Sequence, residues 1–132
     1  MPRDLDRLEA RTKQFTIDVI KLCVKLEVLP GLRQLTWQLI DSAGSVGSNH
    51  RAMRRARSDR EFAAKLQIVN EEIDETVFWI EAAEAVHPGG TSELPTVLRE
   101  GIQLRSIFAK ARATTRGRLE GSDLELRNSP SP

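Results

Sequence analysis

The chain has 132 residues, of which 39% are hydrophobic and 30% charged, with 20 lysines and arginines against 19 aspartates and glutamates. This length suits one domain with one core, and the even balance of charge excludes a wholly disordered acidic or basic chain. A single cysteine, Cys23, excludes an internal disulfide and indicates a reducing cytoplasm. No stretch approaches the roughly 18 apolar residues of a membrane span, so we expect neither a membrane anchor nor a secretory signal.

The first segment predicts one long amphipathic helix from about residue 4 to residue 28. Its apolar positions recur at alternating steps of three and four, which places them on one face of a helix. Two aspartates, Asp4 and Asp6, suit the positive N-terminal end of that helix. The stripe consists of Leu5, Leu8, Thr12, Phe15, Val19, Leu22 and Leu26.

A second helix is expected after the break at Pro30-Gly31, ending near Arg57. Small residues recur along it and predict the close approach of another helix backbone: Ala43, Gly44, Gly47 and Ser48. Ser58 and Glu61 then form a capping box, in which the Ser58 hydroxyl accepts the amide hydrogen of Glu61 and the Glu61 carboxylate accepts that of Ser58. This pattern predicts the start of a third helix near Ser58.

The third helix is expected to end at His87-Pro88, and a fourth to fade near Arg116. Short connections between long amphipathic helices make neighbours antiparallel. The sequence therefore predicts an all-α, up-down-up-down four-helix bundle over residues 1–117. Residues 118–132, which are rich in glycine, serine, proline and charge, are expected to form a disordered tail.

The sequence offers no catalytic or metal-binding constellation, so we expect neither an enzyme nor a cofactor. His50 and His87, the two histidines, lie on different segments, and neither belongs to a metal-ligand pattern. Cys23 has no histidine near it in the helical pattern and is interpreted as a buried structural thiol. A run of carboxylates on the third helix is interpreted as a solvated or subunit-facing surface: Glu71, Glu72 and Glu75.

The most distinctive feature is a run of arginines around the turn between the second and third helices. Five arginines fall within ten positions: Arg51, Arg54, Arg55, Arg57 and Arg60. Arginine's planar fork suits phosphate oxygens, so this turn is a candidate contact for RNA or DNA. Alternatively, the arginines hold the bundle or its subunits together, because antiparallel helices would set Arg51 opposite Glu9 and Arg54 opposite Asp6.

Charge is divided unevenly along the chain. Residues 1–70 carry 13 basic and 8 acidic side chains, whereas residues 71–132 carry 7 and 11. Opposite charge in the two halves, together with the small-residue patch, predicts association between copies of the chain. A second basic group near the end of the fourth helix extends the basic surface: Arg105, Lys110, Arg112, Arg116 and Arg118. Trp37 and Trp79 are expected in the core, unless one of them lies at a subunit contact.

Residues 43–81 carry a pattern that resembles a known family. It reads Gly47-Ser48-Asn49-His50-Arg51-Ala52-Met53-Arg54-Arg55-Ala56-Arg57-Ser58, followed by Phe62, Lys65-Leu66, Ile68-Val69, Glu71-Glu72, Asp74-Glu75-Thr76 and Trp79. The pattern is similar to the four-helix-bundle family first recognised in intervening sequences of bacterial 23S ribosomal RNA genes. It is also similar to the accessory proteins of diversity-generating retroelements. The similarity covers about residues 5 to 115, and His50 stands where a tyrosine is commoner.

The resemblance implies a homo-oligomer, pentameric as in known bundles of this kind, with no established enzymatic activity and, in the retroelement relatives, associated with nucleic acid. The motif's polar residues are expected at nucleic-acid or subunit contacts (Asn49, Arg51, Arg54 and Arg57) and at subunit contacts or ion pairs (Glu71, Glu72 and Glu75). We therefore expect a cytoplasmic, non-enzymatic homo-oligomer that contacts RNA or DNA through the arginine-rich turn. The alternative is a protein-interaction scaffold without affinity for nucleic acid. The retroelement relatives are basic, whereas this chain has a net charge of +1.

Overall fold

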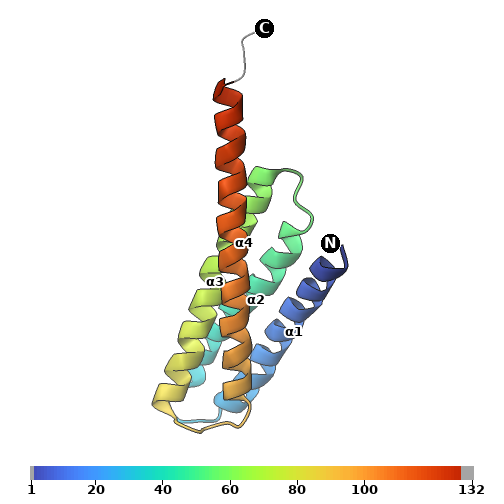
Figure 1. Cartoon of the computed structure of the whole chain (residues 1–132). Helices are drawn as coiled ribbons and strands as arrows, with labels where there is room; N and C mark the ends of the chain where they lie inside the picture. Colours follow the sequence, from blue (N-terminus) through green and yellow to red (C-terminus); the bar gives the residue numbers. More distant parts are fainter. Residues whose placement is uncertain (1, 129–132) are drawn as a thin grey trace.

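The computed structural model describes residues 2–128 as four helices joined by short turns (Figure 1). Helix α1 spans Pro2–Leu26, α2 spans Arg33–Met53, α3 spans Asp59–Val86 and α4 spans Leu94–Asn128. Successive helices run in opposite directions, and no strand occurs among the described residues. The prediction of an all-α, up-down-up-down four-helix bundle is confirmed.

Glycine and proline shape the two turns at one end of the bundle. Gly31 follows Pro30 between α1 and α2 with a φ of +83°, and Gly89 follows Pro88 between α3 and α4 with a φ of +68°. Both values lie in the left-handed region that favours glycine. The ring Nε2 of His87 lies 2.9 Å from the carbonyl oxygen of Pro30, so the two turns are joined by a hydrogen bond.

Apolar side chains from all four helices fill the centre of the bundle. Fully buried members are Phe15, Val19, Leu22 and Leu26 of α1, Leu39 and Val46 of α2, Leu66, Ile73 and Ile80 of α3, and Leu104 and Phe108 of α4. They recur at the three- and four-residue spacing that marks the sequence, so burial of these stripes holds the helices together. The hydroxyls of Ser42 and Thr76 lie 2.9 Å apart within this core, and each also reaches a carbonyl oxygen of its own helix.

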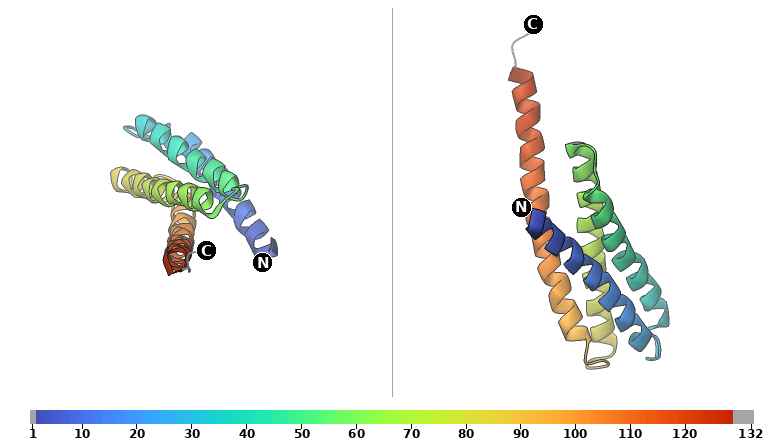
Figure 2. Two further views of the ribbon diagram at one scale, coloured as in Figure 1. Left: turned by 90° about the horizontal axis from the view of Figure 1, so that it is seen from above. Right: turned by 90° about the vertical axis from the view of Figure 1, so that its right-hand side faces the viewer.

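Helix α1 packs mainly on α2 and diverges from α4 toward its own N-terminus (Figure 2). Its contact with α4 combines the close packing of Phe15 against Gly101 with ion pairs. Arg11 donates from Nε and Nη2 to the two carboxylate oxygens of Glu100 at 2.7 and 2.6 Å, and Lys25 pairs with Glu93 just before α4.

The end of α2 and the cap of α3 differ in detail from the sequence prediction. α2 ends at Met53, four residues before Arg57, because residues 54–58 form the turn itself. The amide of Glu61 donates to the Ser58 hydroxyl at 3.0 Å, as predicted. The Glu61 carboxylate, however, accepts from the amide of Arg57 at 3.2 Å, one residue earlier than predicted. The cap thus also fixes the backbone of an arginine in the turn.

Helix α4 continues to Asn128, beyond the Arg116 at which its apolar stripe fades, and projects past the other helices (Figures 1 and 2). Strong helix formers such as Arg118, Leu119 and Glu120 extend it without a continuous apolar face. Residues 129–132 of the expected tail lie outside the described residues. The extra turns matter for function because they bring more charged side chains beside the turn between α2 and α3.

Candidate functional site

The arginine run lies at the end of the bundle where α2 turns into α3. Met53 ends α2 and Ser58 caps α3, so the intervening residues form a tight turn at the surface. α4 passes beside this end, because Arg118 lines the same shallow hollow as Arg57. The structure therefore joins part of the second basic group to the first, although about sixty positions separate them in the sequence.

Arg54 is engaged inside the chain. Its Nη1 donates to the carboxylate of Asp6 at 3.0 Å and to that of Glu9 at 2.7 Å, and its side chain is only 22% exposed. The predicted pairing of Arg54 with Asp6 is confirmed. The predicted pairing of Arg51 with Glu9 is wrong, since Glu9 is taken by Arg54, which lies nearly one helical turn further along. Arg54 thus ties the start of α1 to the end of α2.

The remaining arginines divide into one more paired side chain and a free set. Nη2 of Arg60 donates to Asp123 at 3.2 Å, across α3 and α4. The others are exposed and form no ion pair within residues 2–128. We refer to this free set as the arginine surface: Arg51, Arg55, Arg57 and Arg118. Arg57 and Arg118 share a hollow of about 240 Å³, which brings guanidinium groups from the turn and from α4 together.

Asn49 is not a free polar group. Its Nδ2 donates to the carbonyl oxygen of Ser45 at 2.9 Å and to the Ser45 hydroxyl at 3.0 Å. Both amide hydrogens are therefore used within α2, and the side chain is half-buried. Its predicted place at a nucleic-acid or subunit contact stays a prediction.

The predicted carboxylates of α3 lie away from the arginine surface, roughly 20 Å along the helix from its N-terminal cap. Glu71 accepts a hydrogen bond from Nε2 of Gln67 at 3.2 Å, and Glu75 accepts one from Nε1 of Trp79 at 3.3 Å. Neither glutamate forms an ion pair with a basic side chain within residues 2–128. The two charged groups of the motif therefore do not meet inside one subunit.

Glu72 lies in the middle of this group and is half-buried. Its burial, together with the negative charges of Glu75, Glu71 and Asp41, raises the pKa of the Glu72 carboxyl above its ordinary value. Asp41 belongs to α2, so the negative charge extends over two helices. We refer to these four side chains as the acidic face. Uncompensated like charge of this kind favours a positively charged partner.

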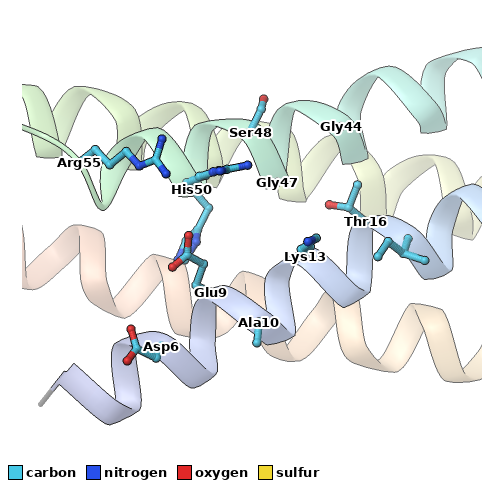
Figure 3. Close-up of a pocket in the computed structure, with 12 residues that line it drawn as sticks. Asp6, Glu9, Ala10, Lys13, Thr16, Gly44, Gly47, Ser48, His50 and Arg55 are labelled. Carbon is cyan, nitrogen blue, oxygen red and sulfur yellow. The ribbon is translucent and has the colours of Figure 1, made fainter.

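A cleft of about 680 Å³ opens between α1 and α2, next to the arginine surface (Figure 3). Glu9 and Lys13 of α1 line one side, and Arg51 of α2 and Arg55 of the α2–α3 turn line the other. Sequence reasoning missed this cleft. Its only signal is Gly44, which was interpreted as a helix contact but has no atom within 4 Å of where a Cβ would stand.

The small-residue patch does make one close contact, at Gly47. A Cβ on Gly47 would lie 2.7 Å from Oγ1 of Thr16, and this hydroxyl donates to the carbonyl oxygen of Ala43 at 3.0 Å. The predicted close approach of another helix is therefore confirmed at Gly47, whereas no helix of the described chain approaches Gly44. Thr16 stands against α2 at this point, whereas the cleft lies open beside Gly44.

His50 lies at the inner side of the cleft and is 1% exposed. Its ring packs on that of Phe108 from α4, with centroids 5.5 Å apart, and neither ring nitrogen has a hydrogen-bond partner among the described residues. Burial lowers the pKa of His50 below 6.5, an effect to which the charge of Arg54 adds and which that of Glu9 opposes. His50 is therefore a neutral, unsatisfied polar ring at neutral pH.

Two further candidates for chemistry are the thiol of Cys23 and a metal site. Cys23 is buried, and its thiol contacts the carbonyl oxygen of Thr36 at 3.7 Å. Burial, reinforced by the charge of Glu27, raises the pKa of Cys23 to about 12, so the thiol is protonated and unreactive. Residues 2–128 contain no group of three or more histidine, cysteine, aspartate or glutamate side chains placed to hold a metal ion.

An exposed apolar surface runs along α1 and α2, away from the arginine surface and toward the Pro30 turn. Trp37 is 60% exposed and does not lie in the core, whereas Trp79 packs against the core. Ile17 of α1 and Gly44 of α2 line the cleft. The exposed apolar side chains lie one or two helical turns from these two residues, toward the Pro30 turn. We refer to them as the apolar face: Ile20, Val24, Trp37 and Ile40. An apolar patch on adjacent helices is typical of a protein contact.

Comparison with known proteins gives a match of fold. No family model and no curated protein matches the chain. The structure is similar to a crystal structure of a protein of unknown function from the S23 ribosomal protein family of Bacteroides thetaiotaomicron. The TM-score is 0.72 at 19% identity, and the match covers 80% of this chain and 97% of the other. This likeness shows that the two proteins share the four-helix bundle.

None of the helices in the described part of the chain contains an apolar stretch long enough to cross a bilayer.

Proposed function

We propose that this protein is a non-enzymatic, self-assembling helical bundle of the cytoplasm that binds RNA or DNA through phosphate contacts. The observation that carries the proposal is the arginine surface: four exposed guanidinium groups, from the α2–α3 turn and from α4, have no carboxylate partner in the described chain. Guanidinium groups hold phosphate oxygens by paired hydrogen bonds, and such groups left unpaired at one end suit a phosphate backbone.

Two further points support a nucleic-acid partner. Arg54 and Arg60 are paired within the chain, and these pairs fix the helices that present the free arginines. The motif resembles proteins from 23S ribosomal RNA intervening sequences, and the structural neighbour is named for a ribosomal protein family. Phe62, the aromatic side chain that lines the hollow at the turn, packs against the core, so the expected contacts are with phosphates rather than stacked bases.

Self-assembly has separate support. The apolar face leaves four large apolar side chains 40–66% exposed on adjacent helices, and the acidic face lacks a basic partner within the described chain. Both would be satisfied by another copy, and the resemblance implies five copies in a ring.

Salt-dependent binding tests the proposal directly. Fluorescence anisotropy is measured with labelled structured RNA and duplex DNA at several salt concentrations, for the wild type and for Arg55→Ala/Arg57→Ala. Losing two phosphate contacts should weaken binding and flatten the slope of log K against log salt by about 1.8 on duplex DNA. The matched control is Arg33→Ala/Arg99→Ala, which removes the same charge from exposed positions near the opposite end of the bundle. Equal loss in both variants would mean that net charge, not the arginine surface, binds the nucleic acid.

A protein-interaction scaffold without nucleic-acid affinity is the second candidate, and the apolar face favours it. The same titration separates the two functions. No binding at low salt by a chain that still assembles would assign the arginines to contacts between proteins.

A further inference from the structure

The cleft between α1 and α2 has the size and shape of a small-molecule site. Its volume of about 680 Å³ falls within the range of roughly 300–1,000 Å³ that is typical of ligand pockets. Its α2 wall includes Gly44, where a Cβ would enter empty space, so the helix backbone is uncovered at this position. The cleft is thus an opening that the chain's own side chains leave unfilled.

The charges that line the cleft sort into a pair of carboxylates and a free set of cations. Asp6 and Glu9 both accept hydrogen bonds from Arg54, which offsets one of their two negative charges. Three cations remain without an ion pair in the described chain: Lys13, Arg51 and Arg55. Lys13 points from α1 toward α2, and Arg55 stands across the opening from Asp6 (Figure 3). The cleft therefore favours an anion.

His50 supplies an observation independent of these charges. Its buried ring lines the cleft, and both ring nitrogens lack a partner, which costs free energy that a bound polar group would recover. Each nitrogen is shielded from water, so a ligand reaches the ring only when a neighbouring side chain turns aside. Glu9, half-buried and drawn near the ring in Figure 3, lines the same cleft and interacts with the ring electrostatically. A neutral imidazole offers one donor and one acceptor, which suits a hydroxyl or an amide-like edge.

We propose that this cleft binds a phosphate monoester of about mononucleotide size, with the phosphate on Lys13, Arg51 and Arg55 and a neutral polar group on His50. The phosphate comes either from a free nucleotide or from the 5′ end of a nucleic-acid strand. The site shares Arg51 and Arg55 with the arginine surface, but it does not depend on the proposed function. Lys13 and Gly44 belong to the cleft alone, and Arg57 and Arg118 to the arginine surface alone.

The two histidines make a direct assay of the full-length protein. In ¹⁵N-labelled protein titrated with adenosine 5′-monophosphate, the ring ¹⁵N signals of His50 should shift. The ring ¹⁵N signals of His87, which is hydrogen-bonded to the carbonyl oxygen of Pro30 at the opposite end of the bundle, should stay unchanged. Adenosine without phosphate should bind far more weakly. An unchanged His50 signal at millimolar nucleotide would overturn the proposal.

Variants separate this site from the arginine surface. Lys13→Ala should weaken nucleotide binding roughly tenfold, as expected for loss of one charged hydrogen bond, whereas Lys21→Ala on the same helix should leave it unchanged. Gly44→Leu should fill the cleft and abolish binding. Arg57→Ala should leave nucleotide binding intact while reducing binding of duplex DNA. Retained affinity in both Lys13→Ala and Gly44→Leu would refute the site, whatever the outcome for nucleic acid.

The source of the phosphate is settled by paired oligonucleotides. A strand with a 5′-phosphate that shifts His50 and binds more tightly than the same strand with a 5′-hydroxyl identifies a strand end as the ligand. Equal binding of the two strands, with a His50 shift only from the free nucleotide, identifies a free phosphate ester.

Discussion

Gly44 and Gly47, three positions apart on α2, should respond in opposite ways to substitution by alanine, because their surroundings differ. Glycine in a helix interior costs about 1 kcal/mol relative to alanine, so Gly44→Ala, whose Cβ meets nothing within 4 Å, should raise the free energy of unfolding by about that amount. Gly47→Ala should lower it by about 1–2 kcal/mol, because its Cβ would lie 2.7 Å from the Thr16 hydroxyl and overpack the contact. Urea unfolding of both variants checks the contrast, and equal effects would contradict it.

His50 should make stability depend on pH near neutrality. Its pKa in the folded chain is lowered, chiefly by burial and further by Arg54, against the opposing charge of Glu9. As pH falls through about 6.5, the unfolded chain takes up a proton that the folded chain resists, so the free energy of unfolding falls with pH. His50→Phe keeps a ring against Phe108 and removes this proton. Unfolding at pH 5.5 and 7.5 should therefore differ less in the variant; an unchanged difference would assign the effect to other groups.

At the scale of elements, an ion pair joins α1 to α4 beside their apolar packing. Arg11 donates two hydrogen bonds to Glu100 and one to Gln103 at 2.7 Å. Both side chains of the Arg11–Glu100 ion pair are about one-third exposed. Solvent screening limits the coupling to about 1 kcal/mol. A double-mutant cycle with Arg11→Ala and Glu100→Ala should measure it, and added salt should reduce it. The single, more exposed bond of Arg105 to Asp74 is the matched control and should couple less.

Sequence periodicity predicted the elements well because each helix carries an apolar stripe that must be buried. The stripe from Phe15 to Leu26 lies in the core as expected. The end of α4 could not be predicted this way, since beyond Arg116 its helix relies on helix-forming residues and not on burial. Periodicity gives the face on which a residue lies, but not how far its side chain reaches. This explains why Arg54, and not Arg51, holds Glu9.

The candidate site was predictable only in part for the same reason. The arginine run is visible in the sequence, but its division into paired and free members depends on which carboxylates lie within reach. Arg118 joins Arg57 only through the fold. The cleft depends on helix spacing at Gly44, which a list of small residues cannot give. Trp37 illustrates the same limit, because its apolar character predicts burial without saying whether the covering surface belongs to the same chain.

At the scale of the whole molecule, the chain carries three kinds of surface in different places. The arginine surface lies at the α2–α3 end, the acidic face lies midway along α3 and α2, and the apolar face lies on α1 and α2 toward the opposite end. Contact through the apolar face would leave the arginine surface free, so self-assembly and phosphate binding do not compete. An assembly would also repeat the arginine surface in every subunit, which raises the avidity for a long nucleic acid without any new contact.

Assembly through the apolar face is tested by a charge placed in it. Trp37→Glu should shift the protein from oligomer toward the 14.8 kDa monomer in light scattering coupled to size exclusion, because an unpaired carboxylate in an apolar contact is costly to desolvate. Leu124→Glu on the projecting end of α4 is the control: its side chain is 58% exposed, against 60% for Trp37, but it lies outside this face. If both variants keep the wild-type mass, the apolar face is not the subunit contact. If only Trp37→Glu dissociates and its monomer still binds nucleic acid weakly, assembly and phosphate binding use separate surfaces. Avidity would then account for the higher affinity of the oligomer for nucleic acid.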